Sequence, residues 1–111
     1  MEIKQKEIIL ISFPFSNKEN SKVRPALVIS NNKFNNYSKD CLVVPMTTIL
    51  KHVKYSFTIN QSDLVLGKLI KKSRIRIDKI TPIEKKMIKM KIGIVNNKVL
   101  EKVKKELKLI I

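Results

Sequence analysis

Several residue types are nearly absent from this chain of 111 residues. Cysteine and histidine occur once each, as Cys41 and His52, tryptophan is missing, and aromatic residues make up 5% of the sequence. A single cysteine excludes an internal disulfide, and one cysteine with one histidine supplies too few ligands for a zinc site within one chain. Few aromatic rings are available to stack on bases. We therefore expect no disulfide framework, no metal and no other cofactor.

Acidic residues are also scarce. Lysine and arginine number 24 against 9 aspartates and glutamates, which gives a formal net charge of +15. The excess is +3 over residues 1–40, +6 over residues 41–82 and +6 over residues 83–111, so it belongs to the whole chain and not to a tail. A domain this basic repels itself unless a polyanion is near, which favours nucleic acid as the partner. The alternative is a lysine-rich surface that only serves solvation.

Arginine is rare even among the basic residues. The sequence has 21 lysines and only three arginines, Arg24, Arg74 and Arg76. Lysine thus supplies general charge, whereas the planar guanidinium of arginine grips phosphate with two parallel hydrogen bonds. Arginine at these positions, in a sequence that otherwise uses lysine, indicates a role for the planar shape of the guanidinium. With only three arginines, the alternative is chance.

Long apolar runs and a signal peptide are missing as well, which predicts a soluble, cytoplasmic protein with no membrane span. Apolar residues still make up 43% of the chain, enough for one modest core, so we expect a single domain over residues 1–111. Cys41 stands in an apolar run and is expected to be buried.

Short apolar segments alternate with polar loops through most of the chain, which predicts strands. The expected strands are 8–13, 26–29, 41–46, 54–60, 68–70 and 74–80, with one helical turn inside 31–40. Thr81, Pro82 and Glu84 resemble a capping box and predict a helix over about 82–91. Asn96 or Asn97 caps a last helix whose apolar stripe contains Val99, Leu100, Val103 and Leu107. The expected fold is mainly β with C-terminal helices, an α+β arrangement in which helices pack on a twisted barrel.

Strict alternation over 74–80 places Arg74, Arg76 and Asp78 on one exposed strand face, opposite Ile75 and Ile77. Two guanidiniums and a carboxylate there indicate phosphate binding, with Asp78 as base or orienting group. The alternative is a cross-strand salt bridge on a solvated face, which these residues alone favour.

Other polar residues stand where strands begin or end. Arg24 joins a polar loop to a buried strand, Thr47 and Thr48 follow the third strand, and Glu19 lies in the first loop. Each has a plain alternative: a surface arginine, turn-forming threonines and a loop salt bridge.

Taken in order, four segments resemble the MazF/PemK toxin family. The match covers roughly residues 5–107 and is carried by Glu7 to Pro14, Lys22 to Ser30 with its Arg24-Pro25 pair, Leu42 to Thr47, and Ser73 to Ile80, followed by Ile92-Gly93 and a closing helix. Lys6 replaces the usual glycine of the family opening, and Lys18 stands where one branch has a loop histidine.

The resemblance implies an SH3-like twisted β-barrel of the MazF/PemK/CcdB-like kind that forms a homodimer. It implies sequence-selective, metal-independent cleavage of single-stranded RNA, and an acidic antitoxin of the MazE/PemI type as partner. Carried over by position, the implied catalytic residues are Arg24, Thr47, Arg76, Asp78 and Glu19. The RNA-binding residues expected beside them are Lys18, Lys22, Asn20, Arg74, Thr48 and Lys51.

Such a toxin cleaves RNA by attack of the 2′-hydroxyl on the neighbouring phosphorus, with Arg24 and Thr47 stabilising the phosphorane and Asp78 or Glu19 accepting the proton. Arg76 orients the phosphate or donates to the leaving group. Two alternatives remain: a non-catalytic nucleic-acid-binding barrel, and a protein that binds a membrane surface through its last helix.

Overall fold

The computed structural model describes residues 1–12 and 23–111, and the strands of these residues form one antiparallel sheet of eight. Its order is β4-β6-β3-β2-β1-β8-β5, and β7 also pairs with β3. The strands are β1 (Glu7–Ser12), β2 (Val23–Val28), β3 (Asp40–Thr47), β4 (Ser56–Ile59), β5 (Leu64–Gly67), β6 (Ser73–Arg76), β7 (Thr81–Glu84) and β8 (Ile88–Val95).

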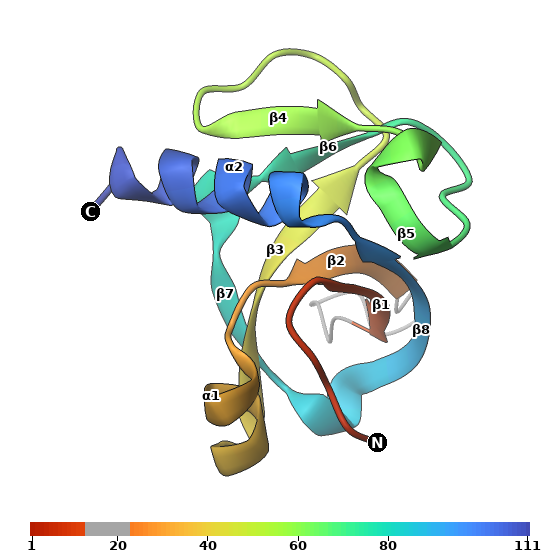
Figure 1. The fold of residues 1–111 in the computed structure, drawn as a ribbon, viewed down its shortest axis with the longest axis vertical. Coiled ribbons are helices and arrows are strands. Elements are labelled where there is room, and N and C mark those ends of the chain that lie inside the picture. Colours follow the sequence, from red (N-terminus) through yellow and green to blue (C-terminus); the bar gives the residue numbers. More distant parts are fainter. Residues whose placement is uncertain (13–22) are drawn as a thin grey trace.

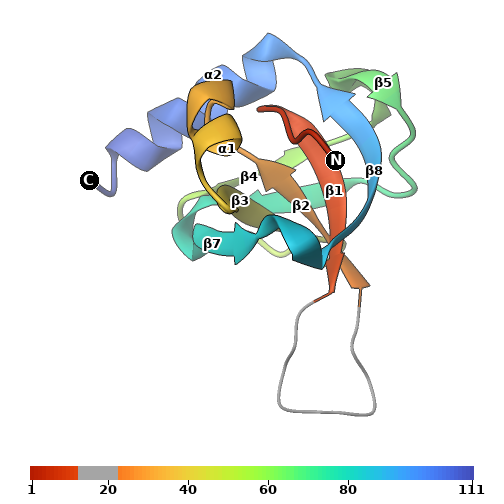
Figure 2. The same ribbon diagram turned by 90° about the horizontal axis from the view of Figure 1, so that it is seen from below.

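Two long strands curl this sheet into a half-barrel (Figure 1). On one side β3 pairs with β2, and on the other its first half pairs with β7 and its end with β6. The register between β8 and β1 shifts twice, and bulges of this kind bend a strand. In Figure 2, β8 curves from beside β1 toward β5, with which it also pairs.

Curling buries the central strands on both faces. Alternate residues of β1, β2 and β3 enter two different apolar clusters, as the period of two requires. One cluster, with Ile8, Leu27 and Val44, packs under the last helix. The other is enclosed by β7, β8 and the N-terminal Ile3, and it contains Cys41, whose predicted burial is confirmed.

The helices of the described residues are capped by asparagine side chains. Asn31 caps α1 (Asn32–Tyr37), and Asn96 caps α2 (Asn97–Lys108) by accepting from the backbone N–H of Val99. The predicted stripe of α2 is confirmed, because Val99, Leu100 and Val103 are buried and Leu107 packs beside them. No helix in this part of the chain is long and apolar enough to cross a membrane.

The predicted helix over 82–91 is wrong. Residues 81–84 form β7, Lys85–Met87 form a single 3-10 turn, and β8 begins at Ile88. The Thr81 hydroxyl donates to the carbonyl of Lys79 and caps no helix. Pairing with β3 buries Ile83 against Cys41, and this tertiary contact outweighs the local capping signal.

Two strand predictions also need correction. Residues 68–70 form no strand, since the strand in this region is β5 and ends at Gly67. The strand expected over 74–80 ends at Arg76 and continues as a 3-10 turn, Ile77–Lys79, which still buries Ile77 beside Ile75. The mainly β, twisted-barrel fold class is confirmed, with one C-terminal helix in place of the expected two.

Replacement of the α2 cap tests this account of the fold. We expect Asn96→Ala to lower the free energy of unfolding by about 1 kcal/mol, because the Val99 N–H loses its acceptor. Asn97→Ala is the matched control one residue along: its exposed side chain accepts from the Lys6 ammonium and from no helix N–H, so we expect a change below about 0.5 kcal/mol. Urea unfolding measures both, and equal losses would contradict the cap assignment.

Candidate active site in a basic cleft

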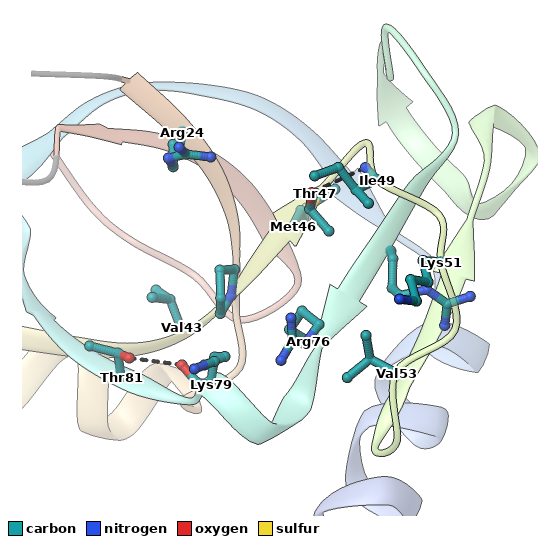
Figure 3. Close-up of a pocket in the computed structure, with 12 residues that line it drawn as sticks. Arg24, Val43, Met46, Thr47, Ile49, Lys51, Val53, Arg76, Lys79 and Thr81 are labelled. Carbon is teal, nitrogen blue, oxygen red and sulfur yellow. Dashed lines mark hydrogen bonds between the residues drawn. The ribbon is translucent and has the colours of Figure 1, made fainter. Parts of the chain in front are cut away.

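A cleft of about 510 Å³ opens on the sheet where β2, β3 and β6 lie side by side (Figure 3). Five cationic side chains line it and no carboxylate among the described residues does, while its apolar walls come from β3 and the connection after it. The cations are Arg24, Lys51, Arg74, Arg76 and Lys79. This concentration of positive charge over an apolar floor suits an anion that also carries an apolar part.

Strand register explains why these side chains meet. Thr47 of β3 pairs with Arg74 of β6, and Ala26 of β2 pairs with Pro45 of β3. Arg24 stands two residues beyond the last pair on β2, on the same face as Ala26, and it lines the cleft together with Thr47 and Arg74. Three neighbouring strands thus supply an arginine, a threonine and an arginine to one cleft.

The ladder between β2 and β3 ends at Ala26 and Pro45, and the cleft opens beyond that point. Arg24 is exposed there and Thr47 is half-buried. The Thr47 hydroxyl oxygen accepts from the backbone N–H of Ile49 at 3.1 Å, and among the described residues its own proton has no acceptor, so it can donate to a ligand in the cleft.

Arg76 reaches the cleft from β6 and is held by Asp78. Its Nε donates to Oδ1 of Asp78 at 2.8 Å and its second terminal nitrogen to Oδ2 at 2.6 Å, a two-pronged ion pair. These bonds lower the pKa of the Asp78 carboxyl and raise the pKa of the Arg76 guanidinium. The pair joins residues two apart in sequence and is therefore not the cross-strand bridge considered from the sequence.

Arg74 differs from its neighbours because it is buried. The prediction that it lies on an exposed face is wrong, since only 8% of the residue is exposed. Its guanidinium donates to the Leu50 carbonyl from two nitrogens, at 3.0 and 3.3 Å, and to the Ser56 hydroxyl at 2.9 Å. Within the described residues, no ion pair to a carboxylate accompanies this buried charge.

The remaining predicted site residues fall into two groups. Lys51 lines the cleft, and Thr48 lines an adjoining hollow that shares Arg24 and Thr47 with it. Four others lie outside the described residues: Lys18, Glu19, Asn20 and Lys22. The structure thus brings Arg24, Thr47, Arg74, Arg76 and Lys51 together, with Asp78 attached through Arg76.

Sequence reasoning missed Lys79, Thr81 and Val53, which also line the cleft. Thr81 was assigned to a helix cap, whereas β7 places it opposite Val43 on the cleft face. Recognition of 81–84 as a strand would have found it. Among the described residues, no group of three histidine, cysteine, aspartate or glutamate side chains is arranged to hold a metal ion.

Solved structures share this fold at low sequence identity. MazE-MazF from Deinococcus radiodurans (Form-II) superimposes with a TM-score of 0.83 and 18% identity over 99% of this chain and 96% of that one. An endoribonuclease in complex with its cognate antitoxin from Mycobacterial species gives 0.78 and 18%, over 96% and 92%. The Mycobacterium tuberculosis toxin MazF-mt6 gives 0.73 and 17%, over 93% of each chain.

Sequence comparison gives the family. No curated protein matches the sequence significantly. The model of the family described as PemK-like, MazF-like toxin of type II toxin-antitoxin system matches residues 4–111, nearly the whole chain. The chain therefore belongs to the PemK-like, MazF-like toxins of type II toxin–antitoxin systems.

Proposed function

We propose that this chain is a sequence-selective endoribonuclease that cleaves single-stranded RNA in the cytoplasm without a metal ion. Family membership and the endoribonuclease among its structural neighbours support the reaction class. The observation that carries the proposal is the cleft, where five cations converge with no carboxylate among its described lining residues. Such a site needs a polyanion, and RNA brings both phosphate charge and apolar bases.

The proposed chemistry is an internal transesterification. The 2′-hydroxyl oxygen of RNA attacks the adjacent phosphorus, the bond to the 5′-oxygen breaks, and a 2′,3′-cyclic phosphate and a free 5′-hydroxyl result. Negative charge grows on the non-bridging oxygens in the transition state, where donors aimed at them are most effective. Arg24 and the Thr47 hydroxyl are the proposed donors, since both line the cleft.

Arg76 and Asp78 are proposed to act by charge and orientation. Both oxygens of Asp78 are engaged by Arg76 and its pKa is lowered, so this carboxylate is a weak base. We therefore assign Asp78 to orienting Arg76 and leave Glu19 as the carboxylate proposed to accept the 2′-proton. The raised pKa of Arg76 makes it a poor acid, and water is the proposed proton donor to the leaving oxygen.

Other residues and partners complete the proposal. Lys51 and Thr48 border the two hollows and are proposed to bind flanking phosphates, as are Lys18, Asn20 and Lys22. The protein is proposed to act as a homodimer and to be inhibited by an acidic antitoxin that covers this basic cleft. Two of the similar structures are MazE-MazF and toxin–antitoxin complexes, which supports such a partner.

RNA cleavage tests the proposed function. With labelled single-stranded RNA and a chelator present, we expect cyclic-phosphate ends, and we expect Arg24→Ala to reduce kcat about 100-fold or more. Lys104→Ala, on the exposed face of α2 away from the cleft, removes the same charge and should leave the rate nearly unchanged. RNA binding without cleavage by the wild-type protein would instead favour a non-catalytic nucleic-acid-binding barrel.

The role of Asp78 is tested by its titration. We expect the carboxyl carbon of Asp78 to titrate below the ordinary value of 3.8 in NMR, and Arg76→Ala to move the midpoint upward because the two hydrogen bonds are lost. Arg24→Ala is the control, because Arg24 lines the same cleft without bonding Asp78, and it should leave that midpoint in place.

The pH dependence of cleavage tests the same role. Asp78→Asn should slow cleavage yet keep the acid limb of the pH–rate profile. Loss of that limb would identify Asp78 as the base.

A further inference from the structure

The connection between β3 and β4, residues 48–55, forms one wall of the cleft without regular secondary structure. It contributes Ile49, Lys51 and Val53 to the lining (Figure 3). A segment of this length with few backbone partners is expected to sample many conformations unless side chains hold it. The position of Lys51 in the cleft therefore depends on whatever fixes this connection.

Arg74 fixes this connection at one carbonyl directly and at a second one through a serine. Two guanidinium nitrogens donate to the Leu50 carbonyl, and a third donates to the Ser56 hydroxyl. The Ser56 hydroxyl in turn donates to the carbonyl of Val53. One buried side chain on β6 thus holds the connection directly at residue 50 and, through serine, at residue 53.

The chemistry of this contact explains why the residue is arginine. A guanidinium offers five N–H donors in a fixed plane and reaches a carbonyl and a hydroxyl at once, whereas a lysine ammonium is a compact point charge. The sequence uses lysine 21 times and arginine three times, and this arginine is 8% exposed with three nitrogens already bonded to protein. Burial of its charge is offset by these acceptors.

We propose that Arg74 is a positioning residue that holds the 48–55 connection as the outer wall of the cleft, so that Lys51 meets the bound RNA. The effect on RNA rests on the proposed function, whereas the holding of the connection does not. Arg74 then affects RNA binding mainly through the connection and not as a direct phosphate contact.

Backbone ¹⁵N relaxation of the free protein tests the holding role, because it reports the motion of each residue whether or not its amide is hydrogen-bonded. In Arg74→Lys, which keeps the charge, we expect the order parameters of residues 49–55 to fall from about 0.85 to about 0.6 or below, while those of β1 and β2 stay unchanged. Ser56→Ala removes only the second link and should loosen residues 52–55 more than residue 50. Ser56→Ala also allows the test if Arg74→Lys does not fold. Arg24→Lys is the matched control, because Arg24 lines the cleft and has no hydrogen bond to the connection among the described residues. Unchanged order parameters in both Arg74→Lys and Ser56→Ala would overturn the proposal.

Binding to a 2′-O-methyl RNA, which cannot be cleaved, tests the consequence. We expect Arg74→Lys to weaken binding about tenfold and Lys51→Ala about threefold, with the double variant no weaker than Arg74→Lys alone, because both act through one element. Independent, additive losses would overturn the positioning role in favour of a direct contact. If the wild-type protein binds no RNA, the proposed function fails, and the relaxation result still decides whether Arg74 holds the connection.

Discussion

The site depends on the antiparallel register that joins β2, β3 and β6. This register pairs Thr47 with Arg74, and the strand β2 carries Arg24 into the same cleft two residues beyond its last pair with β3. A slip of one residue in any of these strands would turn its polar side chain to the opposite face of the sheet. Apolar residues on the opposite face of the same strands prevent that slip, since Leu27, Val44 and Ile75 are fully buried under α2.

The same curl that closes the core also concentrates charge. The central strands are buried on both faces, and the cleft lies beyond the last paired residues of β2 and β3, where Arg24 and Thr47 extend past the apolar core. Cations brought together there repel one another. An anionic ligand relieves this repulsion, which connects the fold of a PemK-like, MazF-like toxin with the RNA proposed as its substrate.

Sequence patterns correctly predicted the features that depend on residues close together in the sequence. The inward placement of Phe57 and Ile75 and the asparagine cap of α2 depend on nearest neighbours in sequence, and the structure confirms them. The helix over 82–91 failed because pairing of β7 with β3, some 40 residues away in sequence, outweighs a capping signal. Burial of Arg74 was equally unpredictable, since it depends on where the Leu50 carbonyl lies in a connection without a repeating pattern. Family resemblance, and not periodicity, singled out Arg24 and Thr47.

RNA phosphate is proposed to bind in the cleft between β2, β3 and β6. Amide chemical-shift mapping on titration with a single-stranded 2′-O-methyl RNA tests this binding site, because it locates the ligand whether or not cleavage occurs. If RNA binds in the cleft, the largest shifts cluster at residues 24, 47–51 and 74–81. Shifts concentrated on the lysine-rich exposed face of α2, with the cleft amides unmoved, would contradict it.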